Sequence, residues 1–389
     1  LGEEISMEEL GGARVHSEMT GNAHFFAQSE DECFVQIRKL ISMIPMNNTT
    51  KAEKIAPAAP LPQYDITSIV PSDPTVPYDV RDVIKALVDE SEFLEVMELF
   101  AANIVVGFGR IAGETVGFIA NQPLVMAGVL DCDSSDKAAR FIRFCDCFNI
   151  PIVTLEDLPG YLPGVDQEHA GVIRHGAKML YAYSEATVPS ITVVLRKAYG
   201  GGYIAMGSRH LRADFVFAWP LAEIAVMGPE GAANIIFKKD IVGAENPAEM
   251  RKLKIQEYKE KFANPYVAAA KGYIDSVIAP AETRMFIEHA LKVSAHKNYD
   301  TLETMHGTFR TTLTKKHLER KPWQPENPKH IKSSIPGTIV EVCVKEGQKV
   351  EAGDMLVVFK AMKMHNNIRA PFAGTVKKVD VKEGDNIPN

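Results

Sequence analysis

The residues of this sequence best suited to chemistry are three consecutive glycines, Gly200, Gly201 and Gly202. They lie between an apolar run over residues 191–195, which we expect to be a strand, and a helical stretch over 201–211. Glycines at a strand-to-helix turn can take positive φ and present backbone N–H groups at the positive end of a helix, an arrangement that binds an oxyanion. Taken alone, the pattern fits a plain tight turn equally well.

A second group of residues that could carry chemistry lies in an internal repeat near the end of the sequence. The segment GTIVEVCVKEGQKV, which starts at Gly337, aligns residue for residue with GTVKKVDVKEGDNI, which starts at Gly374. Each copy alternates apolar and polar residues and contains a glycine turn, as expected of β structure. Between the copies stands Lys363, flanked by Met362 and Met364. A lysine on an exposed turn between two β segments is accessible to a modifying ligase, and a cofactor attached there can swing.

The elements that must position the glycines are short apolar runs alternating with longer helical stretches. We expect strands over residues 104–108, 116–120, 152–155, 191–195, 215–219 and 224–226, and helices over 134–148, 170–184, 201–211 and 230–238. Strands that alternate with crossover helices predict α/β architecture with mainly parallel pairing.

Composition shifts along the chain predict its organisation into segments. Prolines are frequent between residues 45 and 77 and again between 322 and 328, where basic residues also gather. We therefore expect a small segment over 1–45, an extended Pro-rich connector over 46–77, an α/β domain over 78–307, a tether over 308–332 and a β domain over 333–389.

Charge and composition exclude several classes of protein. The 389 residues carry 43 Lys and Arg against 50 Asp and Glu, a net charge of −7 that argues against a general nucleic-acid binder. No run approaches 18 apolar residues, so we expect no transmembrane segment. The five cysteines include no CxxC pair, which predicts no zinc or other metal site and a reducing compartment. The expected location is the cytoplasm, or the mitochondrial matrix of a eukaryote.

The stretch from Leu158 (LPGYLPGVDQEHAGVIRHGAK) through Met227 resembles the C-terminal half of carboxyltransferase subunits of biotin-dependent acyl-CoA carboxylases, of the propionyl-CoA carboxylase β type. Residues 1–45, with EELGGARVHSEMTGNAH from Glu8, resemble the end of the N-terminal half of the same family. The resemblance implies an α/β crotonase-like fold, the ClpP/crotonase spiral. It also implies that the N–H groups of Gly201 and Gly202 hold the ureido oxygen of biotin.

Residues 334–389, with Ala361-Met362-Lys363-Met364, resemble a biotinyl carrier domain, an all-β flattened barrel of biotinyl/lipoyl type. The resemblance implies biotin attached covalently to Lys363. A lipoyl domain typically has an acidic residue before the lysine, whereas this chain has Met362. By the offset of the repeat, the strand after Ala352 has no second copy before Asn389, so we expect this domain to be truncated at its C-terminus.

Together the two resemblances imply carboxyl transfer from carboxybiotin to the α-carbon of an acyl-CoA, either propionyl-CoA or acetyl-CoA. Each step builds negative charge on a carbonyl oxygen, so the reaction needs fixed N–H donors more than a side-chain base. The oxyanion site for the acyl thioester would lie upstream of Leu1 in the family pattern, and we expect this chain to be incomplete for activity alone. Ile204 stands where propionyl-CoA carboxylases usually have aspartate, which points to a role in acyl selectivity. Gly202 stands where the family usually has alanine.

The implied partners are an acyl-CoA substrate, a separate biotin carboxylase subunit, a biotin protein ligase and further copies of the chain, arranged as a hexamer in the family. Two alternatives remain open at this point. One is a methylmalonyl-CoA decarboxylase or transcarboxylase subunit, and the other is a non-catalytic fragment that carries biotin.

Overall fold

The computed structural model describes residues 4–295, 302–304, 307–309, 329, 331, 336–361 and 364–387. The chain forms two compact units, Leu1–Pro322 and Trp323–Asn389, which are considered separately below. Met362, Lys363 and most of the predicted tether over 308–332 lie outside the described residues.

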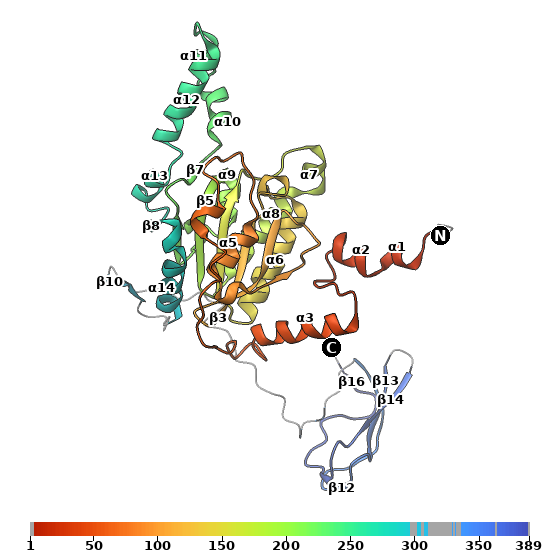
Figure 1. The fold of residues 1–389 in the computed structure, drawn as a ribbon. Coiled ribbons are helices and arrows are strands. Elements are labelled where there is room, and N and C mark those ends of the chain that lie inside the picture. The colour runs from red at the N-terminus through yellow and green to blue at the C-terminus, as the bar shows by residue number, and fades with distance from the viewer. Residues whose placement is uncertain are drawn as a thin grey trace. The chain divides into compact units, whose positions relative to one another are not determined.

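The described part of the first unit is built on an eight-stranded sheet in the order β1-β2-β3-β4-β5-β6-β8, with β7 paired to β5 (Figure 1). Strands β1 to β3 are antiparallel, and β3, β4, β5, β6 and β8 run parallel, as does β7 beside β5. Their bounds are β1 (Phe93–Val96), β2 (Ile104–Ile111), β3 (Glu114–Asn121), β4 (Ile152–Leu158), β5 (Ser190–Tyr199), β6 (Phe215–Ala218), β7 (Glu223–Ala225) and β8 (Ser276–Val277). A short hairpin, β9 (Leu302–Thr304) with β10 (Gly307–Phe309), stands apart from this sheet.

Helices cover both faces of the sheet, which is why its central strands β3 and β4 are buried along almost their whole length. On one face, α6 (Cys132–Cys147) and α8 (Val172–Glu185) pack against the sheet through Ile142 and Met179. On the other, α5 (Val80–Leu87) and α14 (Thr283–Ala295) pack through Ile84 and Ile287. The mainly parallel α/β architecture predicted from the sequence is confirmed.

The other helices of the first unit are shorter or lie away from the sheet. They are α1 (Met7–Gly11), α2 (Ala13–Glu18), α3 (Glu30–Met43), α4 (Ile66–Ile69), α7 (Val165–Ala170), α9 (Gly200–Ala205), α10 (Pro229–Ile236), α11 (Lys238–Val242), α12 (Pro247–Lys261) and α13 (Pro265–Ala270). Helices α10, α11 and α12 pack mainly on one another, and Figure 1 shows them extending beyond the edge of the sheet.

All six predicted strands are present, but two predicted helices are wrong in extent. The helix expected over 201–211 ends at Ala205, because Gly207 takes a φ of +69° and packs against Tyr183. The helix expected over 170–184 is preceded by a separate helix, α7, and Gly171 with a φ of +89° lies between the two.

The second unit is a small β domain whose two repeat halves exchange strands. Its strands are β11 (Gly337–Val342), β12 (Lys349–Val350), β13 (Met355–Ala361), β14 (Met364–Arg369), β15 (Gly374–Thr375) and β16 (Asn386–Ile387). Strand β11 of the first half pairs with β16 of the second, and β12 of the first half pairs with β15 of the second. Ile339 and Phe359 lie in its core.

A buried ion pair joins β4 and β5 within the sheet. Two extra residues in β5 interrupt its pairing with β4, since Glu156 lies opposite Val194 but Leu158 lies opposite Ala198. In this bulge the Nε of Arg196 donates to Oδ2 of Asp157 at 3.0 Å, and the two side chains are only 3% and 0% exposed.

The remaining donors of this segment bond to the connector. Nη1 of Arg196 donates to the carbonyl oxygens of Asp73 and Val76, both at 2.9 Å. Nζ of Lys197 donates to the carbonyl oxygen of Pro74 at 3.1 Å. The connector is thus held against the strand that leads into the glycine turn.

We predict that Arg196→Met lowers the free energy of unfolding of the first unit by about 3 kcal/mol, because it removes the closer of the two cations paired with buried Asp157 and leaves only Lys197, whose Nζ lies 3.9 Å from Oδ1. Lys178→Met is the control, since the exposed pair of Lys178 with Asp136 is worth less than about 1 kcal/mol. Guanidinium denaturation followed by the fluorescence of buried Trp219 measures both variants. Equal losses would contradict a special role of the buried pair.

Candidate active site

The glycine turn lies where the sequence predicts it, between the end of β5 at Tyr199 and the start of α9. Gly200 takes a φ of +60°, and a Cβ at this position would lie 2.9 Å from the carbonyl oxygen of Val226. Positive φ and this close approach of two backbone segments both require glycine. The turn is therefore more tightly specified at Gly200 than at the two glycines that follow.

The backbone N–H groups at the start of α9 have no cap from a side chain, since Tyr199 at the N-cap makes no such hydrogen bond. The first N–H groups of an α-helix also lack acceptors within the helix. Gly201 is exposed, and a Cβ there would have no atom within 4 Å. Gly202 is buried, and a Cβ there would lie 2.5 Å from Cδ1 of Leu158. The two proposed donors thus sit in different surroundings, one open and one packed.

The loop after β4 borders this turn. The Cα of Gly160 lies 3.1 Å from the position that a Cβ of Gly202 would take. Gly160 has a φ of +132° and Gly164 a φ of +139°, and a Cβ at either would contact nothing within 4 Å. The loop is attached through Leu130, whose N–H donates to the carbonyl oxygen of Gly160 at 3.0 Å.

Ile204 lies on α9, two residues after Gly202, and its side chain is 39% exposed. Its carbonyl oxygen accepts a hydrogen bond from Oγ of Ser208 at 3.0 Å. The structure therefore brings Gly201, Gly202 and Ile204 together on one short helix with an apolar side chain at the surface.

Two buried polar residues near the turn were not predicted from the sequence. Glu156 is fully buried in β4, and neither of its carboxyl oxygens has a hydrogen-bond partner among the described residues. Burial, reinforced by the charge of Asp157, raises the pKa of Glu156 well above its usual range, which favours the neutral form of this carboxyl group. Its signal in the sequence was an acidic pair inside an otherwise apolar strand.

Tyr203 on α9 is the second of these residues. Its hydroxyl is buried and, within the described part of the chain, makes no hydrogen bond. Burial raises the pKa of Tyr203. Burial thus favours the uncharged forms of both side chains near the helix that begins at the glycine turn.

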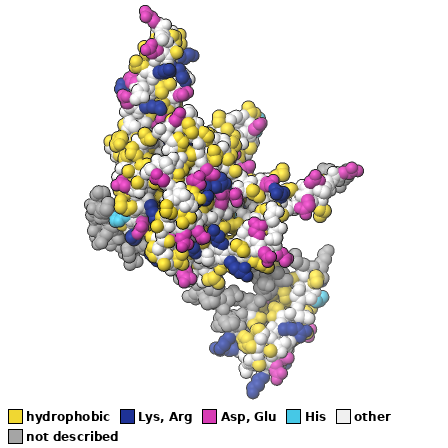
Figure 2. Space-filling view, in the orientation of Figure 1, with side chains coloured by type: hydrophobic (Ala, Val, Ile, Leu, Met, Phe, Trp, Pro, Cys, Tyr) yellow, Lys and Arg dark blue, Asp and Glu magenta, His cyan; other side chains and the backbone are white. Residues whose placement is uncertain are grey.

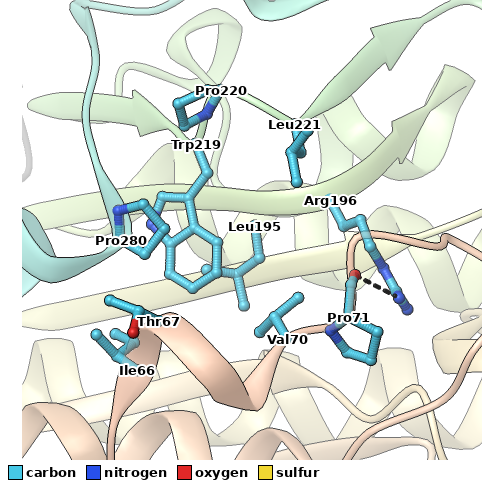
Figure 3. Close-up of a pocket in the computed structure, with 10 residues that line it drawn as sticks. All are labelled: Ile66, Thr67, Val70, Pro71, Leu195, Arg196, Trp219, Pro220, Leu221 and Pro280. Atoms are coloured by element: carbon cyan, nitrogen blue, oxygen red, sulfur yellow. Dashed lines mark hydrogen bonds between the residues drawn. The ribbon is translucent and has the colours of Figure 1, made fainter.

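A separate pocket of about 220 Å³ lies near the buried ion pair (Figure 3). Most of its walls are apolar. Its polar side chains already bond within the chain, Thr67 to Asp65 and Arg196 to Asp157 and the connector. The lining residues are Ile66, Thr67, Val70, Pro71, Leu195, Arg196, Trp219, Pro220, Leu221 and Pro280. This pocket offers no unengaged side-chain donor for an oxyanion among these residues.

The second candidate site falls on a β-hairpin. Ala361 at the end of β13 pairs with Met364 at the start of β14, and Met364 is 66% exposed. Met362 and Lys363, which connect the two strands in sequence, lie outside the described residues. A lysine between two paired strands, beside an exposed residue, fits a group attached covalently and reached by a modifying enzyme.

Other kinds of site were searched over the described residues. No three His, Cys, Asp or Glu side chains among them gather as metal ligands. No helix in the described ranges has the length and apolar character needed to cross a bilayer.

Comparison with known proteins assigns both units. The family model described as carboxyl transferase domain matches residues 1–309, and the model described as biotin-requiring enzyme matches residues 329–389. The methylmalonyl-CoA carboxyltransferase 12S subunit of Propionibacterium freudenreichii subsp. shermanii is 54% identical over 309 residues, which cover 79% of this chain and 59% of that protein. The propionyl-CoA carboxylase beta chain of Saccharopolyspora erythraea is 50% identical over 323 residues, with the same coverage.

A crystal structure of transcarboxylase 12S, described as a hexamer assembly with methylmalonyl-coenzyme A and methylmalonic acid bound, matches with a TM-score of 0.73 and 54% identity. The match covers 79% of this chain and 60% of that one. The chain thus spans about 60% of the length of the relatives it matches. The crotonase-like fold of the first unit and the biotinyl type of the second, implied by the resemblances, are confirmed.

We predict opposite effects on stability for alanine at the two proposed donors. Gly201→Ala should leave the melting temperature unchanged or raise it slightly, because the methyl group enters open space and alanine favours the helix by up to about 1 kcal/mol. Gly202→Ala should cost about 1–3 kcal/mol, because the methyl group overlaps Leu158. Thermal unfolding measures both. A second substitution, Leu158→Val, should relieve the cost of Gly202→Ala, and a simple sum of the two losses would refute this reason.

Proposed function

The chain belongs to the carboxyl transferase family, and on that premise we propose that it transfers a carboxyl group from biotin carried on the same chain to the α-carbon of an acyl-CoA. The observation that carries the proposal is that one chain contains both a carboxyl transferase unit and a biotin-requiring domain. The first has a glycine turn without a side-chain cap, and the second has a lysine between paired strands. In this proposal the acyl group is propionyl or acetyl.

The proposed work of the glycine turn is to hold negative charge. In our proposal the N–H groups of Gly201 and Gly202 donate to the ureido oxygen of biotin. Biotin attached to Lys363 supplies the carboxyl group in an activated form. Because the donors belong to the backbone and start a helix, they need no reorganisation when charge develops on the oxygen, and removing one such donor typically costs about 10²–10³ in rate. The raised pKa of buried Glu156 is consistent with this role, since burial disfavours an ionised carboxylate that would oppose the charge.

A second function is favoured by one of the relatives. The methylmalonyl-CoA carboxyltransferase subunit takes its carboxyl group from an acyl-CoA, as its printed name indicates. A methylmalonyl-CoA decarboxylase or transcarboxylase subunit would use the same turn and the same lysine in the reverse direction. Incubation with carboxyl-labelled methylmalonyl-CoA in the absence of ATP separates the functions, because only the second passes the label beyond biotin over many turnovers, as free CO₂ or to an acceptor other than an acyl-CoA. A biotin-carrying fragment without catalysis would do neither.

The proposed partners extend beyond the substrate. They are a biotin carboxylase subunit, a biotin protein ligase and further copies of this chain. A homo-oligomer is supported by the hexamer of the matched structure and by exposed apolar side chains on α10 to α12, which Figure 2 shows among Lys and Arg. These side chains are Ile235, Ile236, Val242 and Leu253. Sedimentation equilibrium of the full chain measures its oligomeric state.

The cellular compartment expected from the sequence stays a prediction.

We predict that Lys363→Ala abolishes biotinylation. Lys363 alone combines flanking methionines with a position between the two repeat halves, and it stands between paired strands. Streptavidin blotting after co-expression with a biotin ligase measures the modification, and Lys360→Ala on β13 is the matched control, which should still be labelled. Biotin signal that persists in Lys363→Ala would rule out this attachment site.

We predict that Ile204→Asp changes acyl selectivity. An exposed apolar side chain beside the glycine turn favours an apolar contact, which a charged carboxylate would remove, so the ratio of kcat/KM for acetyl-CoA to that for propionyl-CoA should change by about tenfold. Turnover is measured with the full chain and any partner polypeptide that turnover requires. Met285→Asp on α14, also an exposed apolar residue, is the control. An unchanged ratio would contradict the selectivity role, and loss of both activities would indicate a packing role instead.

A further inference from the structure

The residue that joins β5 to the glycine turn is held by its side chain as well as by its backbone. Tyr199 ends β5 and forms the N-cap of α9, and its ring is only 8% exposed. A Cβ at Gly228 would lie 3.1 Å from this ring, so the ring packs directly on the backbone there. The hydroxyl of Tyr199 donates to Oε2 of Glu223 on β7. The Tyr199 side chain is therefore held at two points, by the packing of its ring on Gly228 and by the hydrogen bond from its hydroxyl to Glu223. These contacts fix the direction in which the backbone enters the glycine turn.

The carboxylate that receives this hydrogen bond is in turn held by a third residue. Oε1 of Glu223 lies 2.8 Å from Nζ of Lys259 on α12, and the carboxylate side chain is only 13% exposed. Charged hydrogen bonds of low exposure are stronger than neutral ones and restrict both partners. Tyr199, Glu223 and Lys259 thus form a continuous series of contacts from the glycine turn to a helix that lies away from the main sheet.

The backbone at Val226, which packs against the glycine turn, is part of the same series of contacts. The carbonyl oxygen of Val226 is the atom nearest to where a Cβ of Gly200 would be. On either side of Val226, Ala225 and Met227 pack into the hydrophobic cluster that Tyr258 of α12 shares with α10. Strand β7 and the segment after it therefore contact the glycine turn on one side and helices α10 to α12 on the other.

We propose that Tyr199, Glu223 and Lys259 are positioning residues, which hold the N–H groups of Gly201 and Gly202 in their binding geometry by attaching the turn to helix α12. This inference rests on the proposed function of the two glycines. None of the three residues needs to touch a substrate. Their effect is to reduce the range of orientations that the uncapped start of α9 can adopt, and donors that are fixed in advance contribute more to catalysis than donors that must be ordered during the reaction.

The test compares four variants of the full chain, two test variants, one control and the rescue variant Lys259→Arg. Tyr199→Phe keeps the ring and removes the hydroxyl, and Lys259→Met removes the charge that holds Glu223. Lys261→Met is the matched control, because Lys261 lies on the same helix and pairs with Glu257 of that helix. Hydrogen exchange detected by mass spectrometry reports the order of α9 directly, for example at the Met206 amide, which donates to the carbonyl oxygen of Gly202 at 3.1 Å. Turnover is measured with any partner polypeptide that it requires.

We expect α9 amides to exchange about tenfold faster in Tyr199→Phe and in Lys259→Met, and within about twofold of the parent chain in Lys261→Met. In both test variants kcat should fall about tenfold while the KM for acyl-CoA stays unchanged, and Lys259→Arg should restore both properties. Unchanged exchange at α9 in both test variants would overturn the proposal. A rise in exchange that spreads to β3 and β4 would also overturn it, because the residues would then support the fold in general. Faster exchange at α9 with unchanged turnover would support the positioning role and contradict the proposed function of the glycines instead.

Discussion

The buried ion pair between Arg196 and Asp157 determines where β5 ends, and the glycine turn follows from that position. The two side chains are only 3% and 0% exposed, and at this depth the loss of a close ionic partner costs several kcal/mol. The guanidinium also bonds to carbonyl oxygens of the connector, so a segment without regular structure is ordered by the same side chain. Strand, connector and turn are thus fixed together.

The two sides of β4 and β5 near the turn differ sharply in polarity. On the side that faces the connector, Asp157 accepts hydrogen bonds from the guanidinium of Arg196 and from the N–H of Lys197. Toward α9, Val194 and Ala198 pack with Tyr203, and burial raises the pKa of Glu156. The donor of buried Gly202 at the start of this helix acts in surroundings of lower effective dielectric constant than that of exposed Gly201, and its attraction for a negative oxygen is less screened than in water. The alternation of side chains along two strands therefore separates a charged structural network from a site suited to developing charge.

The sequence was sufficient for the central strands and for the location of the glycine turn. Buried parallel strands are continuous apolar runs, and three glycines after such a run leave little doubt about a turn. Helix α12 could not be found this way, because residues 247–261 carry charges on all sides and have no apolar stripe. The pair of Arg196 with Asp157 was also hidden, since it depends on two extra residues in β5 that no local pattern reveals. Likewise, the contacts from Tyr199 to Glu223 and from Glu223 to Lys259 join β5, β7 and α12, which come together only in the folded chain.

The exchange of strands in the second unit has a consequence for how that unit responds to cleavage. Gly337 at its start pairs with Ile387 near its end, and Val350 of the first half pairs with Gly374 of the second, so neither half completes its own ladder. A proteolytic cut between Arg369 and Gly374 would leave two fragments with unpaired strand edges rather than two folded halves. Such edges pair with equivalent edges of another molecule. Nicked chains would therefore associate by domain swapping, with each half completed by the complementary half of a neighbour.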